Sequence, residues 1–171
     1  MSGEPTPPSS RPDEPALSHV GADGRARMVD VSHKPTTART ARAAGSIVMS
    51  AAALAAVRDN TVSKGDALAV ARIAGVMAAK RTAELVPLCH QVPLSDVVVD
   101  LVVDEALPGV RVETVARTLA TTGVEMEAIV AATVALVTVY DMVKAIDKSM
   151  VLGDIRLLEK TGGKSGTWRR G

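Results

Sequence analysis

Residues 128–140 constrain the fold more than any other segment, because these thirteen residues carry no charge. They lie within the longer stretch 122–148, whose charged residues gather at its two ends. The length of this stretch predicts one long helix. A surface helix has a polar face, so a helix that is apolar all round is covered on more than one side. In a chain of 171 residues, we expect a second subunit to supply part of that cover.

The composition predicts a domain with an aliphatic core. The chain is 47% hydrophobic and 23% charged, has a net charge of +1 and contains no phenylalanine. The near-neutral charge gives no reason to expect non-specific binding to nucleic acid or to membranes. The single cysteine, Cys89, excludes an intrachain disulfide and a cysteine zinc cluster. The N-terminus has no apolar segment, and the uncharged run is too short to span a bilayer, so we expect a soluble cytoplasmic protein.

The first 17 residues are expected to form a disordered tail. Five of the nine prolines lie within residues 1–15, among Ser, Gly, Asp and Glu. Such a segment cannot bury enough apolar surface to offset the entropy that ordering would cost. Residues 18–171 are expected to form a single domain, with a flexible C-terminal end rich in Gly and Lys.

The order of the expected elements indicates an α+β fold. We expect a strand at 27–32, extended or irregular chain at 37–50 with a bend at Gly45, a short helix capped by Ser50, a second helix from Asp66 through Leu85, a hairpin of strands at 97–103 and 110–118, the long helix, and a strand at 155–158. This β-α-β-β-α-β order, with its first helix in two pieces, predicts a ferredoxin-like sandwich. In that fold, helices pack on one face of an antiparallel sheet.

Both ends of the long helix carry candidate site residues. Glu125 fits a capping box with Thr122, and Glu127 is a carboxylate that the cap does not need. At the other end, Asp141 and Lys144 share one face of the helix. Each has an ordinary interpretation, as a carboxylate at the positive end of a helix dipole or as a surface ion pair. A lysine beside a carboxylate can also exchange a proton with a substrate.

Glu127 and Asp141 are too far apart to touch one small substrate within one subunit. They are fourteen residues apart in the sequence, which is about 21 Å along a helix at 1.5 Å per residue. If both residues serve one site, two subunits must supply them.

The remaining candidates are a short loop segment and scattered cations. Leu88, Cys89 and His90 follow the second helix, at a junction where loops often carry functional groups. His90 can transfer a proton at neutral pH, although a lone loop histidine is more often only hydrogen-bonded, and Cys89 reads best as buried packing. Arg39 and Lys64 are solvated charges unless the fold gathers them around an anionic substrate. Lys160 and Lys164, in a glycine-rich C-terminal segment, have the same two interpretations. No metal cluster is predicted, because the chain has only three histidines.

Five segments closely resemble one family, the cyclic pyranopterin monophosphate synthases (molybdenum cofactor biosynthesis protein C, MoaC). They are RMVDVS, ARIAGVMAAKRTAELVPLCH, TGVEMEA, VYDMVKAIDK and RLLEKTGGKSG. The resemblance covers residues 19–170. Two departures are Gln91-Val92, where the family often has Pro-Leu, and His33, where an acidic residue is common.

The resemblance implies an activity, an assembly and a set of site residues. The activity is that of a phosphorus–oxygen lyase of molybdenum cofactor biosynthesis. It converts (8S)-3′,8-cyclo-7,8-dihydroguanosine 5′-triphosphate (cyclic dihydro-GTP) to cyclic pyranopterin monophosphate and diphosphate. The implied assembly is a ferredoxin-like hexamer, built as a trimer of dimers. The implied catalytic residues are Asp141 and Lys144, and the implied substrate-binding residues are Leu88, Cys89, His90, Met126, Glu127, Lys64 and Arg39. The reaction has no net redox change, so no organic cofactor or metal site is expected, and Mg²⁺ on the triphosphate stays open.

Two other classes of protein remain as alternatives. A ferredoxin-like nucleic-acid module stacks bases on sheet aromatics, and this chain has one Tyr, on a helix, and one Trp, near its end. A catalytically silent oligomeric scaffold would use the same apolar helix for assembly alone. Diphosphate release from the cyclic dihydro-GTP separates a scaffold from an enzyme.

Overall fold

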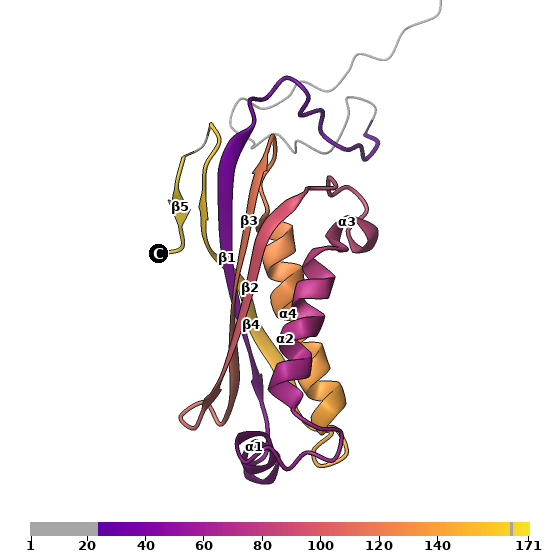
Figure 1. Ribbon diagram of the computed structural model, residues 1–171, viewed down its shortest axis with the longest axis vertical. Helices are drawn as coiled ribbons and strands as arrows, with labels where there is room; N and C mark the ends of the chain where they lie inside the picture. Colours follow the sequence, from indigo (N-terminus) through magenta and orange to yellow (C-terminus); the bar gives the residue numbers. More distant parts are fainter. Residues whose placement is uncertain (1–23, 165) are drawn as a thin grey trace, which may run out of the picture.

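The computed structural model describes residues 24–164 and 166–171, which form an antiparallel sheet with helices on one face (Figure 1). The strand order is β2-β3-β1-β4-β5. The elements are β1 (Thr37–Val48), α1 (Ala51–Arg58), α2 (Ala67–Ala79), α3 (Thr82–Leu85), β2 (Leu94–Asp104), β3 (Gly109–Ala120), α4 (Glu125–Val143), β4 (Val151–Thr161) and β5 (Trp168–Arg169). The predicted ferredoxin-like sandwich is confirmed, with α2 and α4 packed on one face of the sheet.

The central strand is β1, which pairs antiparallel with β3 on one side and β4 on the other. The sequence predicted this segment only as extended or irregular chain. Its alanines Ala41 and Ala43 face the core and are fully buried. The expected bend at Gly45 is instead a register shift against β4, between Ala44 and Ser46, within a continuous strand.

Two helix starts agree with the sequence. Ser50 accepts a hydrogen bond from the Ala53 amide, and Asp66 accepts one from the Ala69 amide, so both side chains satisfy amides in the first turn of a helix. The second helix was expected to run through Leu85, and this is wrong. It ends at Ala79, and α3 follows as a separate turn.

The break between α2 and α3 has a local cause. Arg81 is not helical, with φ −114° and ψ 13°. The buried hydroxyl of Thr82 donates to the carbonyls of Ala78 and Ala79, which lie in the last turn of α2. Such a side chain competes with the helical hydrogen bonds and favours a bend.

The two long helices approach closely because their contact surface is built from small residues. A side chain at Gly75 of α2 would place its Cβ 3.0 Å from the carbonyl oxygen of Ala131 and 3.3 Å from the Cβ of Ala135, both on α4. The aliphatic core continues from this contact to the sheet through residues such as Leu136 and Val112. The predicted core of aliphatic residues is confirmed.

The long helix starts later than the capping pattern predicted. Its N-cap is Val124, which makes no side-chain cap, so the capping box of Thr122 and Glu125 is wrong. Glu125 instead bonds Lys160 across to β4. Within the described residues, α4 is the one helix long and apolar enough to cross a bilayer. A core helix meets that criterion too, and α4 packs against the sheet and α2.

The strand expected at residues 27–32 is wrong, because this segment is irregular. Local bonds use its polar groups: the Asp30 carboxylate accepts from the Ser32 amide, and the Val31 carbonyl accepts from the Lys34 amide. These turn-like bonds compete with a strand ladder.

The C-terminal part of the sheet is larger than expected. Strand β4 extends well beyond 155–158, and β5, which no sequence signal predicted, pairs Trp168 with Lys160. The expected tail, residues 1–17, lies outside the described residues.

Candidate active site

The predicted site residues gather in two groups at opposite ends of α4. The glutamate cluster consists of Leu88, Cys89, His90, Glu125, Met126 and Glu127, and the lysine cluster consists of Lys64, Asp141 and Lys144. Figure 1 shows why they are separate: α4 lies beside α2, with its N-terminal end near α3 and its other end near α1. The separation of about 21 Å expected from helix geometry therefore holds.

The glutamate cluster lines an open pocket of about 500 Å³ between the start of α4 and the segment after α3. Its lining residues are Val86, Leu88, Cys89, His90, Thr122, Gly123, Glu125, Met126 and Glu127. All five substrate-binding residues predicted at this end are among them. This volume lies within the range typical of small-molecule sites.

Glu127 is the most deeply buried acid of the pocket, with 3% of its surface exposed. Burial raises the pKa of its carboxyl group, because the charged form loses hydration, and nearby Glu125 adds to this rise. Its Oε2 atom has no hydrogen-bond partner among the described residues. Buried acceptors are nearly always paired in folded proteins, so this oxygen is suited to bind a donor from outside the chain.

Cys89 supports Glu127 and is not suited to be a nucleophile. Its Sγ lies 3.8 Å from Oε1 of Glu127 and donates to it. Burial, and then the negative charge of Glu127, raise the pKa of the thiol to about 11. The thiol is therefore protonated at neutral pH, and the thiolate needed for attack is scarce.

His90 joins the pocket to the irregular N-terminal segment. Its Nε2 atom lies 2.8 Å from the carbonyl oxygen of Val29. Because the expected strand at 27–32 is instead such a segment, its backbone is free to hold the imidazole ring.

The lysine cluster is more exposed, and all of its charges are paired. The Lys64 ammonium lies 2.8 Å from both the carbonyl oxygen and the carboxylate of Asp141, and Lys144 Nζ lies 2.6 Å from the same carboxylate. The hydrogen bonds from Lys144 and Lys64 lower the pKa of Asp141 to about 2. The Asp141 carboxylate in turn raises the pKa of Lys144. At neutral pH the cluster is thus an ionised acid between two ammonium groups.

The two predicted phosphate ligands lie at opposite ends of α4. Lys64 belongs to the lysine cluster, whereas Arg39 donates to the carbonyls of Ala120 and Thr121, just before α4, at 3.0 Å each. Lys160 is also engaged there, since its Nζ lies 2.9 Å from Oε1 of Glu125. Arg39 therefore holds the backbone just before α4, and Lys160 holds the side chain of Glu125.

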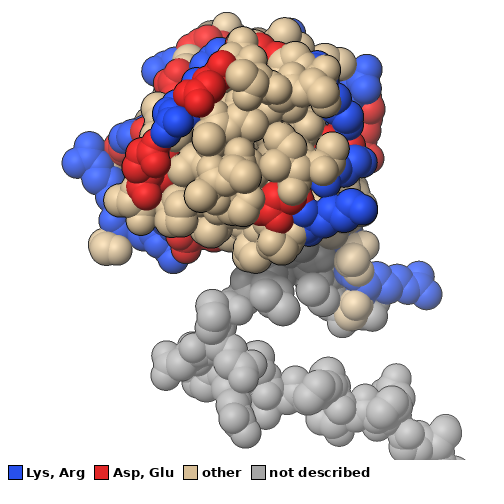
Figure 2. Space-filling model, turned by 90° about the horizontal axis from the view of Figure 1, so that it is seen from below, with Lys and Arg blue, Asp and Glu red and all other residues tan. Residues whose placement is uncertain are grey.

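Figure 2 views the molecule from the end where α1 lies. Uncharged side chains cover most of the centre of this surface, and charged side chains lie mainly toward its edges. Exposed apolar residues at this end include Val48, Ile146 and Val151. An apolar surface with a charged rim is typical of a protein contact.

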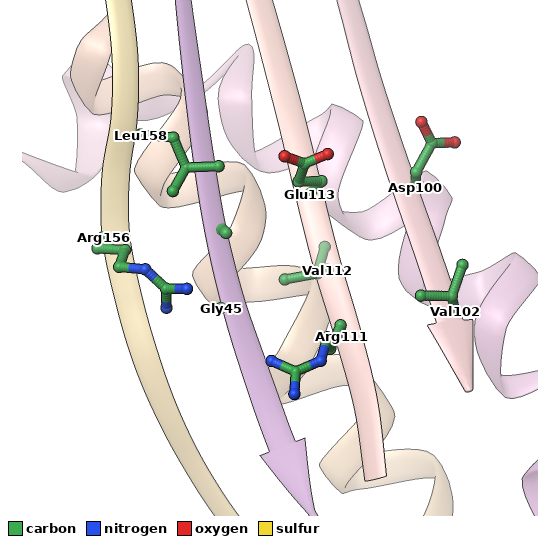
Figure 3. A pocket seen from close by; sticks show the side chains of 9 residues that line it. Gly45, Asp100, Val102, Arg111, Val112, Glu113, Arg156 and Leu158 are labelled. Carbon is green, nitrogen blue, oxygen red and sulfur yellow. The ribbon is translucent and has the colours of Figure 1, made fainter. Parts of the chain in front are cut away.

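A second hollow, of about 310 Å³, lies on the open face of the sheet (Figure 3). The guanidinium groups of Arg111 and Arg156 lean toward β1 from the strands on either side of it. Asp100 and Glu113 also line it, so both signs of charge are present. None of the predicted site residues lines this hollow, and it lies apart from both clusters.

Comparison with known proteins identifies the family. A sequence model described as the MoaC family matches residues 28–163. The chain belongs to the MoaC family. A relative from Cereibacter sphaeroides (strain KD131 / KCTC 12085), named cyclic pyranopterin monophosphate synthase, is 57% identical over 150 residues, covering 88% of this chain and 94% of the relative. Relatives of the same name from Methylobacterium sp. (strain 4-46) and Thermomicrobium roseum (strain ATCC 27502 / DSM 5159 / P-2) are 55% and 53% identical, covering 90% of this chain and 96% and 93% of theirs.

Membership of the MoaC family confirms the resemblance seen in the sequence, but several contacts of the site were missed. The Glu125–Lys160 ion pair and the bond from Cys89 to Glu127 join residues 35 and 38 positions apart. The family segments contained all four residues, so they could have been considered together. The contact between His90 and the Val29 carbonyl could not have been found in this way, because every residue has a backbone carbonyl and the sequence does not mark this one.

Proposed function

We propose that this chain is a cyclic pyranopterin monophosphate synthase, a phosphorus–oxygen lyase that acts on the cyclic dihydro-GTP described above and releases diphosphate. The observation that carries the proposal is the 57% identity to a synthase over 94% of that relative's length. The direct contact between Lys144 and Asp141, the two residues assigned to catalysis, supports it.

The lysine cluster is suited to proton donation and to binding of phosphate. The reaction opens and recloses a ring, and a sugar hydroxyl attacks the α-phosphate while diphosphate leaves. Lys144 is protonated at neutral pH, so it acts first as a general acid, held by the ionised Asp141. Lys64 adds positive charge for the triphosphate.

The glutamate cluster is suited to hold the base of the substrate. Oε2 of Glu127 would accept a hydrogen bond from a ring N–H group, which satisfies its buried and unpaired position. His90 would assist proton transfer beside it, and Leu88 and Met126 would cover the flat faces of the ring.

Two of the donors of Arg39 are occupied by carbonyl groups, so only its remaining N–H groups can reach a phosphate.

One substrate needs both clusters, and the exposed stripe of α4 indicates how two copies would combine them. Along this stretch the exposed or half-buried positions are 126, 129, 130, 133, 134, 137, 138, 140, 141 and 144. The outermost two, 126 and 144, are equally far in sequence from position 135. A second copy in antiparallel orientation, related by a two-fold axis near that position, would set Met126 against Lys144 of its neighbour. Val137 is 50% exposed in this stripe and would be covered. We propose that such dimers assemble into a hexamer.

The first test is a turnover assay with the cyclic dihydro-GTP, which detects diphosphate. The wild-type chain is expected to release diphosphate, and Lys144→Ala and Asp141→Asn are expected to reduce the rate by on the order of a thousandfold. A wild-type protein without turnover would refute the proposed function, and near-full turnover of either variant would remove the assigned pair. The same assay with and without EDTA shows whether turnover needs Mg²⁺ on the triphosphate.

The second test concerns the shared site. At substrate concentrations well below KM, Glu127→Gln and Asp141→Asn are each expected to lose most of their activity alone, Glu127→Gln through a raised KM and Asp141→Asn through a lowered kcat. Co-expressed, they form mixed oligomers in which one interface receives both intact residues, so part of the wild-type activity returns. If every mixture assembles yet stays inactive, the two clusters belong to separate sites.

We also propose that the enzyme is cytoplasmic.

A further inference from the structure

Asp147 is a buried carboxylate to which neither the family resemblance nor the proposed mechanism gives a role. It is 8% exposed and follows the C-terminal end of α4. Its Oδ2 accepts from the Ser50 amide at 2.7 Å, and its Oδ1 accepts from the amide and the hydroxyl of Ser149 at 2.8 and 2.6 Å. The two oxygens of Asp147 thus bind two different parts of the chain, Oδ2 at Ser50 and Oδ1 at Ser149.

These hydrogen bonds connect the two segments that deliver the lysines of the lysine cluster. Ser50 is the N-cap of α1, and the loop after α1 carries Lys64. Asp147 itself lies three residues after Lys144, in a turn where its amide donates to the Val143 carbonyl. The Asp147–Ser50 bond therefore fixes the start of α1 to the end of α4.

A second contact holds the same turn against α4. The hydroxyl of Tyr140 donates to the carbonyl of Lys148 at 3.0 Å. The turn is thus bound to α4 through Tyr140 and to α1 through Asp147. A shift of the Asp147 side chain would move α1 and its following loop relative to α4.

We propose that Asp147 is a positioning residue, which holds Lys64 and Lys144 together beside Asp141 by joining α1 to the end of α4. It does not touch the substrate. Its effect on turnover rests on the proposed function, whereas its effect on the geometry of the lysine cluster does not.

The chemistry of the carboxylate suits this role. The hydrogen bonds from Ser149 and from the Ser50 amide lower the pKa of Asp147 to about 2, so it is ionised at neutral pH. An ionised carboxylate offers only acceptors, which matches the three donors around it. An asparagine offers one oxygen and turns an NH₂ group toward one set of donors, so at least one of them loses its partner.

The test compares Asp147→Asn with a matched control, Asp104→Asn. Asp104 is also a turn carboxylate that accepts from two amides, those of Ala106 and Leu107, and pairs with Arg111. It lies in the β2–β3 turn and contacts no residue of the lysine cluster. The first readout is the pKa of the Asp141 carboxyl group, measured by ¹³C NMR, because this pKa depends on the closeness of both ammonium groups. The second is kcat for diphosphate release.

In Asp147→Asn, the pKa of Asp141 is expected to rise from about 2 toward its ordinary value of 3.8, and kcat is expected to fall about tenfold or more, since small displacements of a catalytic group are costly. In Asp104→Asn, both are expected to stay at wild-type values.

If Asp147→Asn does not fold, Ser149→Ala decides the matter. It removes one donor and leaves the Ser50 bond, so a smaller rise in the Asp141 pKa is expected. An Asp141 pKa that stays at the wild-type value in the folded variants would overturn the proposal. If the wild-type protein has no turnover but the variants still shift the Asp141 pKa, the positioning role is upheld and the proposed function is refuted.

Discussion

The two ends of α4 differ in how complete they are. At the lysine cluster, every charge has a partner within the chain: Asp141 is held by two ammonium groups and its pKa falls to about 2. At the glutamate cluster, burial raises the pKa of Glu127, and one of its oxygens has no partner among the described residues. The charges of the lysine cluster are thus paired within the chain, whereas Oε2 of Glu127 lacks a hydrogen-bond donor among the described residues.

This difference indicates a division of work. The lysine cluster, which is exposed and already ion-paired, can donate a proton and neutralise phosphate without rearrangement of its side chains. A buried carboxyl group with a free oxygen gains most from a ligand that supplies the missing donor. The comparison therefore predicts different kinetic effects for substitutions at the two ends.

The largest expected effect separates the two ends by kinetics. Lys144→Ala is expected to reduce kcat by on the order of a thousandfold with little change in KM, because it removes a proton donor. Glu127→Gln is expected to raise KM about tenfold, because it weakens binding of the base. Steady-state rates of diphosphate release measure both.

The control for this comparison is Lys148→Ala, an exposed lysine close to the lysine cluster but outside it. Its rate is expected to stay within about twofold of the wild type. Equal losses of kcat at Lys144 and Glu127, with no change in KM at either, would contradict the division of work.

The next effect concerns Cys89 at the glutamate cluster. Its pKa of about 11, against 9.0 for an ordinary thiol, leaves about one hundredth of the usual thiolate at neutral pH, since each pKa unit is a factor of ten. Alkylation by iodoacetamide at pH 7.5 is therefore expected to be about 100-fold slower than for glutathione, and Cys89→Ser to keep activity within about threefold. A thiol that reacts as fast as glutathione would show that burial beside Glu127 does not raise the pKa of Cys89.

The smallest effect is on stability. Because folding raises the pKa of Glu127, the folded chain binds a proton more tightly than the unfolded chain, so stability is lost as pH rises from the unfolded pKa of about 4.5 through the folded value. Glu127→Gln removes this cost and is expected to stabilise the protein at neutral pH by about 1 kcal/mol, or about 2–4 °C in Tm. The gain should vanish at pH 4. Thermal unfolding of both proteins at several pH values measures it, and an equal Tm difference at every pH would mean that titration of Glu127 is not its source.

Local patterns predicted local structure well. The caps at Ser50 and Asp66 and the contact of Asp141 with Lys144 follow from spacings of three residues, which the sequence displays directly. The many β-branched residues at 97–103 and 110–118, with Pro108-Gly109 between them, likewise predicted the β2–β3 hairpin.

The failures came from distant partners. Thr122 and Glu125 have the spacing of a capping box, but Lys160 competes for the carboxylate from 35 residues away. The segment 27–32 was expected to be a strand, yet its backbone is used by turns and by His90. The resemblance to a family implied that Lys64 belongs to the site, but its contact with Asp141, 77 residues on, was not predicted.

The contact between His90 and the Val29 carbonyl has a consequence for proton transfer. A carbonyl oxygen can only accept, so Nε2 of His90 must carry the hydrogen of this bond. In the neutral ring, Nδ1 is then the basic nitrogen, and any proton that His90 takes up from a ligand has to arrive at that atom. The irregular segment that replaced an expected strand thus selects one tautomer of the histidine and, with it, the direction from which the ring can act as a base.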